Sequence, residues 1–202
     1  ASCPATIATA SYVCEPILIP TYSNDSCNTF WYPIPGFNGF TALLTENAQS
    51  SETSSNSGMW TPSLQSAGVY QVEAYIANHG IFTTHCNWGD ATLGADTSSA
   101  KYFIHAASGD VTVTKDQLPL SNRWLNLGQY TFNAGTEGYV TLSNLTDELR
   151  NSTNVSFSAM KFSLVSYLIP TISSIFPLNA AVGSTGITLT VNGTNFVDGS
   201  VV

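Results

Sequence analysis

Hydrophobic and polar residues alternate with a period of two along much of the chain, which is the pattern of strands with one buried face. The clearest example is the segment 68–77, in which Tyr70, Val72, Ala74 and Ile76 alternate with Gln71, Glu73 and Tyr75. An amphipathic helix would instead repeat its apolar positions every three or four residues. The segment therefore predicts a half-buried strand.

The same alternation predicts further strands and the turns between them. Residues 101–106 and 110–115 flank Ala107-Ser108-Gly109, which is typical of a hairpin. Residues 124–133 predict a longer strand with a bulge at Gly128, because a glycine inside a strand marks a bend. Short strands are expected at 17–19 and 138–143, and a further strand at 155–165.

Irregularities in the pattern predict where the regular strands end. Along 155–165 the alternation slips by one position between Ala159 and Met160, which predicts a bulge or a change of facing. Residues 46–58 are expected to form a polar loop, and 146–150 is the helix candidate. Strands at about ten-residue spacing without intervening helices predict an all-β fold, an antiparallel β-sandwich of jelly-roll or immunoglobulin-like type.

Composition changes the expected surface of this sandwich. Only 9% of the 202 residues are charged and the net charge is −8, so solubility must come from Ser, Thr and Asn. Five scattered cations cannot neutralise a run of phosphates, which argues against nucleic-acid binding and against a basic membrane patch. These cations are Lys101, Lys115, Arg123, Arg150 and Lys161. No apolar run reaches the roughly 18 residues that a membrane-spanning helix needs.

The cysteines indicate an oxidising compartment. They are Cys3, Cys14, Cys27 and Cys86, and none forms a C-x-x-C pair. Three of them fall in an N-terminal segment with little apolar periodicity, which disulfides would stabilise. Four cysteines permit three pairings, of which Cys3–Cys14 with Cys27–Cys86 is our expectation. Together with a start at Ala-Ser-Cys, which resembles a chain after removal of a signal peptide, this predicts an extracellular or cell-surface location.

Sequons for N-glycosylation occur at Asn24, Asn144, Asn151, Asn154 and Asn192. In a chain so rich in Asn, Ser and Thr, this number is close to what chance gives, so the sequons permit glycosylation without demonstrating it. Asn144, Asn151 and Asn154 lie together in what is expected to be an exposed connection. We therefore expect any glycans there first.

Several stretches resemble the golvesin C-terminal-like domain, a β-sandwich module also appended to xanthan lyases and other secreted polysaccharide enzymes. The resemblance covers residues 37–166. It rests on Trp60 before a turn, a G-x-Y strand at 68–70, Y-x-I-H at 102–105, W-x-x-L-G-x-Y-x-F at 124–132 and A-x-K-F at 159–162. These motifs are packing signatures, so the resemblance implies a fold rather than a ligand.

A second resemblance begins at Pro170. The segment 170–196 is similar to the opening of an IPT/TIG immunoglobulin-like domain, with P-x-I-x-x-I-x-P at 170–177 and G-I-T-L at 186–189. The expected organisation is a Cys- and Pro-rich segment at 1–36, a golvesin-like sandwich at 37–166 and an incomplete IPT/TIG domain at 167–202. So short a C-terminal piece cannot bury a stable core alone.

Candidate chemistry is sparse. The histidines His79, His85 and His105 and nearby acids lack the G-x-S-x-G context of a serine hydrolase. A transition-metal set at His79, His85, Cys86 and Asp90 has irregular spacing, and its cysteine is expected to be oxidised. Asp90 and Asp96, with carbonyls of Gly89 and Gly94, could hold a calcium ion that orders their loop. No other cofactor is expected.

Exposed aromatic rings that stack on sugar rings are the remaining candidates for a binding site. Trp60 and Trp124 lie in packing motifs and are expected in the core. Trp31, Tyr32 and Trp88 lie in irregular polar stretches and are the candidates for glycan stacking.

These features predict a non-catalytic extracellular structural or adhesive module of a multidomain secreted or cell-surface protein. Its partners would be neighbouring copies of the chain or other surface proteins, and it could assemble into a layer or filament. The alternative is a carbohydrate-binding module that keeps a secreted enzyme on its polysaccharide.

Overall fold

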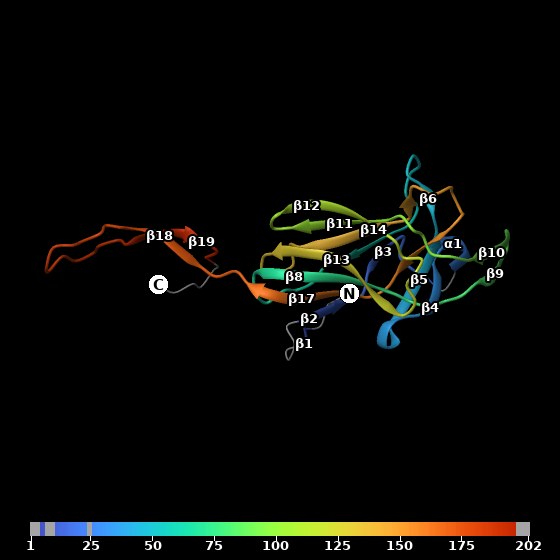
Figure 1. The fold of residues 1–202 in the computed structure, drawn as a ribbon, viewed down its shortest axis with the longest axis horizontal. Helices are drawn as coiled ribbons and strands as arrows, with labels where there is room; N and C mark the ends of the chain where they lie inside the picture. The colour runs from blue at the N-terminus through green and yellow to red at the C-terminus, as the bar shows by residue number, and fades with distance from the viewer. Residues whose placement is uncertain (1–4, 7–10, 24–25, 197–202) are drawn as a thin grey trace.

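The fold consists of strands arranged in two large sheets with smaller sheets at one end (Figure 1). It is seen in a computed structural model that describes residues 5–6, 11–23 and 26–196. Within these residues the helical elements are short: α1 (Ser26–Thr29) and a 3₁₀ turn η1 (Phe37–Gly39). The all-β prediction is therefore confirmed.

Two five-stranded antiparallel sheets form the body. The first has the order β1 (Ala5–Thr6), β2 (Ser11–Cys14), β17 (Met160–Tyr167), β8 (Gly68–Ile76) and β13 (Arg123–Phe132). The second has the order β12 (Gly109–Lys115), β11 (Ala100–Ala106), β14 (Tyr139–Ser143), β7 (Ser57–Trp60) and β3 (Ile17–Ile19). The N-terminal segment thus contributes strands to both sheets.

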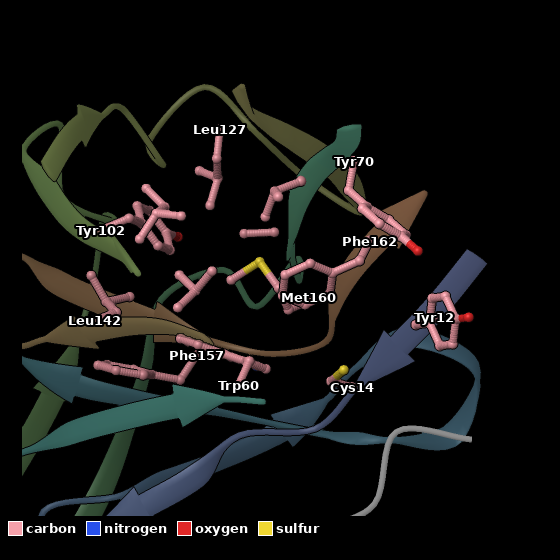
Figure 2. Packing of buried hydrophobic residues seen from close by; sticks show 14 of the residues in the cluster. Tyr12, Cys14, Trp60, Tyr70, Tyr102, Leu127, Leu142, Phe157, Met160 and Phe162 are labelled. Atoms are coloured by element: carbon pink, nitrogen blue, oxygen red, sulfur yellow. The ribbon is translucent and has the colours of Figure 1, made fainter. Parts of the chain in front are cut away.

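The main core fills the space between these two sheets (Figure 2). Strand β8 buries every second residue from Gly68 to Ile76, as its alternation predicts. From the facing sheet, Trp60 is 1% exposed, stacks on Phe157 at 6.2 Å between ring centroids and donates from Nε1 to the carbonyl of Ser158. The burial of such large rings is the main source of stability for the sandwich.

Smaller elements cover one end of the sandwich (Figure 1). They are the three-stranded sheet β16 (Asn154–Phe157), β5 (Thr41–Glu46) and β4 (Tyr32–Pro35), the hairpin β9 (Phe82–Cys86) and β10 (Gly89–Leu93), and the parallel pair β15 (Leu145–Thr146) and β6 (Ala48–Gln49). A second apolar cluster lies beneath them. Its buried members are Tyr32, Ile34, Ala42, Leu44, Ala77, Ala91 and Leu93.

Three local predictions are confirmed. Strands β11 and β12 form the expected hairpin, with Ala106 opposite Gly109. The register of β13 shifts between Asn126 and Gly128, and Gly128 has a φ of 135°, so the bulge lies where the glycine permits it. The slip at Ala159-Met160 is a change of facing, because β16 pairs with β5 whereas β17 pairs with β8 and β2.

Two local predictions are wrong. Residues 146–150 are not helical, because the Thr146 hydroxyl accepts hydrogen bonds from Asn47 Nδ2 and the Glu148 amide, and such bonds compete with helix formation. The polar loop 46–58 contains β6 and the start of β7, and it buries Asn47 and Asn56. The polar composition of this segment predicted exposure. These two asparagines are nevertheless buried, because the Nδ2 group of each donates hydrogen bonds within the fold.

The C-terminal hairpin β18 (Thr171–Phe176) and β19 (Thr190–Thr194) extends away from the sandwich (Figure 1). Every residue of β18 is exposed. Ile172, Phe176 and Leu178 therefore present apolar side chains to solvent. The expectation that this piece buries no core of its own agrees with this exposure.

Candidate functional site

A surface cleft of about 280 Å³ lies among the small elements at the covered end of the sandwich. Its volume is close to the lower end of the range of about 300–1,000 Å³ for small-molecule sites. The lining residues are Phe30, Thr45, Glu46, Asn47, Ala48, Ser55, Trp88, Asn144, Arg150 and Asn151. One side is aromatic and the rest is largely polar.

The aromatic side consists of Phe30 and Trp88. Their ring centroids are 6.1 Å apart and the planes are tilted by 43°. Trp88 is 52% exposed and Phe30 is 43% exposed, so both rings are accessible at the surface. The two rings therefore form a platform that a ligand can cover.

Trp88 is held at the tip of the hairpin formed by β9 and β10. Gly89 makes the turn with a φ of 134°, a conformation that glycine adopts readily. The Cys27–Cys86 disulfide joins this tip to α1 with a Cα–Cα distance of 5.5 Å. The Trp88 indole Nε1 donates to the Cys27 carbonyl at 3.3 Å. The disulfide and this hydrogen bond together fix the indole at the cleft.

Phe30 is placed by an unusual backbone conformation. Its φ is 54°, in the left-handed region that bulky residues rarely adopt. The buried Asn56 donates from Nδ2 to the carbonyls of Thr29 at 3.0 Å and Phe30 at 3.4 Å, and so holds this conformation. Such strain persists only where the surroundings impose it, and it concentrates at functional sites.

Two buried asparagines shape the polar side of the cleft. Asn47 Nδ2 donates to Thr146 Oγ1 at 2.8 Å and to the Leu149 carbonyl at 3.0 Å, while its Oδ1 accepts from the Ser152 and Thr153 amides. These bonds tie down the connection that follows β15. The amide of Asn47 is fully engaged, so its role is structural.

Asn144, which lies between β14 and β15, has the same structural role. Its Oδ1 accepts from Ser54 Oγ at 3.1 Å and from the Ser55 amide at 3.2 Å. Its Nδ2 donates to the Glu46 carbonyl at 3.1 Å and to Ser55 Oγ at 3.0 Å. Asn144 therefore joins three segments that line the cleft rather than facing a ligand.

The groups that remain available to a ligand are Glu46, Arg150 and Asn151. Burial raises the pKa of the Glu46 carboxyl, and the nearby Arg150 guanidinium opposes that rise. Arg150 Nη1 also bonds Glu52 Oε1 at 3.1 Å, while its side chain stays largely exposed. A carboxylate, a guanidinium and an amide thus share one cleft with the aromatic platform.

The expected exposure of Trp31 and Tyr32 is wrong. Trp31 is fully buried in the main core, packs edge-on against Phe157 and donates from Nε1 to the Pro20 carbonyl. Tyr32 is 1% exposed and belongs to the second cluster. The two consecutive rings enter the two different cores, which leaves neither for stacking on a glycan.

Phe30, one position earlier, is the ring that sequence reasoning missed. Its sequence signal was its place beside Trp31 and Tyr32, since three consecutive aromatics cannot all point the same way. Trp88 is exposed as expected. The expectation for Trp60 as a core residue is confirmed, whereas Trp124 is half-buried and packs on Phe37 and Tyr75 outside the main core.

The structure separates the sequons by exposure. Asn144 and Asn154 are each 2% exposed, so the expectation of a wholly exposed connection is wrong. Both amides are bonded within the fold, Asn154 Nδ2 to the Ala95 carbonyl at 3.5 Å. Asn151 and Asn192 are exposed. Asn24 lies outside the described residues.

Asp90 and Asp96 do not form a common calcium site. Asp90 lies at the exposed tip of the β9–β10 hairpin and bonds His85 at 2.7 Å, whereas Asp96 is buried and bonds His79 at 3.3 Å. Each carboxylate thus has its own histidine partner. Among the described residues, no group of three or more His, Cys, Asp or Glu side chains could hold a metal ion.

The buried pair of Asp96 and His79 has shifted proton affinities. Burial raises the pKa of Asp96, and the hydrogen bond to Asp96 raises the pKa of His79. His105, the third histidine, bonds Asp110 and stacks on Tyr139. The pair of His85 and Asp90 lies in the same hairpin as Trp88, but none of these six residues lines the cleft.

The disulfide between Cys27 and Cys86 is the pair expected from the sequence. Cys14 is also disulfide-bonded and fully buried. Its expected partner, Cys3, lies outside the described residues. The part of the chain that the structure describes contains no helix with the length and apolar character to span a membrane.

The chain folds as a disulfide-bonded β-sandwich with a cleft on its surface. The family model of the Golvesin C-terminal domain matches residues 41–162, and the chain belongs to this family. A solved xanthan lyase from Paenibacillus is similar in fold, with a TM-score of 0.51 and 18% identity, over 80% of this chain and 12% of the lyase. At this identity the likeness concerns the fold alone. No curated protein matches the chain.

Proposed function

We propose that this chain is a non-catalytic extracellular module that binds a carbohydrate chain in the cleft. The observation that carries the proposal is the exposed platform of Phe30 and Trp88 beside Glu46, Arg150 and Asn151. A sugar ring has an apolar face that packs on aromatic rings and a rim of hydroxyls that bond to polar groups. The cleft offers both kinds of contact.

The single carboxyl group among the described residues that line the cleft argues for binding rather than hydrolysis. Most glycosidases need two carboxyl groups about 5–9.5 Å apart across the glycosidic bond. Among the described residues that line the cleft, Glu46 is the one with a carboxyl group. Glu52, which bonds Arg150, does not line the cleft. We therefore assign recognition, not bond cleavage, to these residues.

The family and the fold neighbour support a setting outside the cell and near polysaccharides. The disulfide agrees with an oxidising compartment. The structural neighbour is named for its action on xanthan, although this chain spans only 12% of its length. Xanthan is accordingly the first polysaccharide to test, followed by neutral and acidic polymers of other composition.

Affinity electrophoresis through gels that contain each polysaccharide tests the proposal. The wild-type chain should be retarded by at least one polymer, and Trp88→Ala should lose about tenfold or more in affinity, the effect of removing one stacking ring (~1.4 kcal/mol per tenfold). Tyr167→Ala is the matched control, because Tyr167 is exposed at the end of β17 and does not line the cleft. Wild-type migration unaffected by any polymer, or full retention by Trp88→Ala, would reject the proposal.

The structural or adhesive role expected from the sequence is a second candidate, favoured by the C-terminal hairpin. Ile172, Phe176 and Leu178 are 50%, 70% and 87% exposed on this projecting element. Burial of such apolar surface against a second copy would be favourable. Sedimentation at increasing concentration should show association that Phe176→Asp abolishes, and a monomer at every concentration would rule it out.

A further inference from the structure

We infer that Asn151 is an N-glycan acceptor and that the first sugar of its glycan packs on the platform of Phe30 and Trp88. The glycan of the chain would then occupy the cleft and compete with an external carbohydrate. The competition rests on the proposed function of the cleft. The assignment of Asn151 as acceptor and the packing of its first sugar rest on the position of Asn151. Both can be tested whether or not the cleft binds an external carbohydrate.

The structure sorts the sequons by whether their amide can carry a sugar in the folded protein. The amides of Asn144 and Asn154 are buried and donate to backbone carbonyls. A sugar on either amide would break these hydrogen bonds and disrupt the surrounding packing. A bulky glycan is compatible only with an exposed amide. Of the sequons within the described residues, those of Asn151 and Asn192 meet this condition.

Asn151 is placed at the rim of the cleft by its backbone. Its φ of 54° is a left-handed conformation that asparagine tolerates well, and its amide N–H donates to the Asn47 carbonyl at 3.0 Å. The next residues are anchored by the Asn47 side chain, which accepts from the Ser152 and Thr153 amides. The backbone is therefore fixed while the Asn151 side chain is exposed.

The cleft brings this acceptor and the aromatic platform together. Asn151, Phe30 and Trp88 all line the same space of about 280 Å³. A sugar attached at the rim therefore begins its chain at the platform, and tethering raises its effective concentration there far above that of a free sugar. Asn192, on the projecting hairpin, does not line this cleft.

The modification is a group transfer from a lipid-linked oligosaccharide, catalysed by the transferase of a secretory pathway. A bond forms between Asn151 Nδ2 and the anomeric carbon of the first sugar. The bond from that carbon to the lipid pyrophosphate breaks, and the pyrophosphate leaves with the electron pair. The proton from the amide nitrogen passes to a base of the transferase. No oxidant or reductant is required.

Glycopeptide mass spectrometry of the chain secreted from a eukaryotic cell line tests the acceptor. Occupancy is expected at Asn151, with Asn192 as the second exposed site and none at Asn144 or Asn154. Asn151→Gly should remove the glycan at position 151 and leave the one at Asn192. The fold should be retained, because glycine suits the positive φ at position 151. An unoccupied Asn151, or sugar on Asn144 or Asn154 in folded protein, would overturn the inference.

Quenching of tryptophan fluorescence by acrylamide tests the packing. Of the four tryptophans, all within the described residues, only Trp88 is more than half exposed. Trimming with an endoglycosidase that leaves one sugar should keep Trp88 shielded. Full removal with an amidase should raise the quenching constant roughly twofold, because it uncovers the one exposed indole. Trp88→Phe should abolish the difference, and equal quenching of all three glycoforms would refute the packing.

A last comparison separates failure of this inference from failure of the proposed function. Protein made without glycans in an oxidising bacterial periplasm tests polysaccharide binding alone. If it binds and the fully glycosylated protein binds equally well, the cleft function stands and self-occupancy is wrong. If it binds no polysaccharide while the glycan still shields Trp88, the packing stands and the external ligand is wrong.

Discussion

The sandwich body and the cleft end of this molecule are specified by different kinds of interaction. In the body, alternating apolar residues of β8, β11 and β14 meet in one core, and their burial fixes which face is inside. At the cleft end, strands are short and their positions depend on amide side chains and a disulfide. Non-directional burial builds the scaffold, whereas directional bonds place the groups that line the cleft.

The comparison predicts that the two regions respond differently to truncation of a side chain. Loss of an apolar side chain in the body should lower the stability of the whole domain. Loss of a bond at the cleft end should disturb the platform as well as stability. Four substitutions test this difference, in order of decreasing effect.

Trp60→Ala should have the largest effect. It removes a ring that is 1% exposed, leaves a cavity beside Phe157 and orphans the Ser158 carbonyl, so the free energy of unfolding should fall by about 3–5 kcal/mol. Denaturant unfolding followed by circular dichroism measures it. Trp124→Ala is the matched control, and its smaller loss should reflect its half-buried position. Equal losses would contradict the assignment of Trp60 to the core.

Replacement of both Cys27 and Cys86 by serine should come next. The bridged residues are 59 positions apart, and closing a loop of this length accounts for about 4 kcal/mol in the chain-entropy model, with about 2–4 kcal/mol typical of measurements. The hairpin tip also loses its tether, so acrylamide should quench Trp88 more strongly while the core remains folded. Unchanged stability together with unchanged quenching would argue against this role for the disulfide.

Asn47→Ala should lower the free energy of unfolding by about 1–3 kcal/mol, because the Ser152 and Thr153 amides lose their acceptor. Hydrogen exchange at these two amides, measured by NMR, should accelerate before exchange in β8 does. The exposed Asn133 provides the control, and Asn133→Ala should leave both measurements unchanged. Slow exchange at Ser152 and Thr153 in Asn47→Ala would show that the bonds are dispensable.

Glu46→Gln should have the smallest effect, and its sign depends on pH. Because burial raises the pKa of Glu46, the folded chain binds this proton more tightly than the unfolded chain does. The wild type should therefore gain stability relative to Glu46→Gln as the pH falls through the raised pKa to below the ordinary value of 4.5. Melting temperatures of both proteins at neutral and acidic pH measure the difference. If the wild type instead loses stability relative to Glu46→Gln as the pH falls, the pKa of Glu46 is not raised in the folded chain.

Sequence periodicity predicted the body well, because the alternation of apolar and polar residues within each strand determines which of its faces is buried. The strand at 68–77, the bulge at Gly128 and the change of facing after Ala159 all follow from local pattern. Pattern also singled out Trp88, which lies between two short strands at an exposed tip. These features need no information from distant residues.

The remainder of the cleft could not be predicted in this way, because its geometry depends on long-range bonds. The outward direction of Phe30 rests on its positive φ, held by an asparagine 26 positions later. Without that bond, the alternation gives no reason to prefer Phe30 over Trp31. Likewise, the burial of Asn144 depends on Glu46 and Ser54, which are far away in the sequence.

The neighbouring rings of Trp31 and Tyr32 have a consequence for how the domain melts. Because one ring belongs to each apolar cluster, neither cluster can open without pulling on the peptide bond between them. The two cores should therefore unfold as one cooperative unit. Phe30, directly before this pair, should keep its position until that single transition, so the cleft and the folded state should disappear at the same temperature.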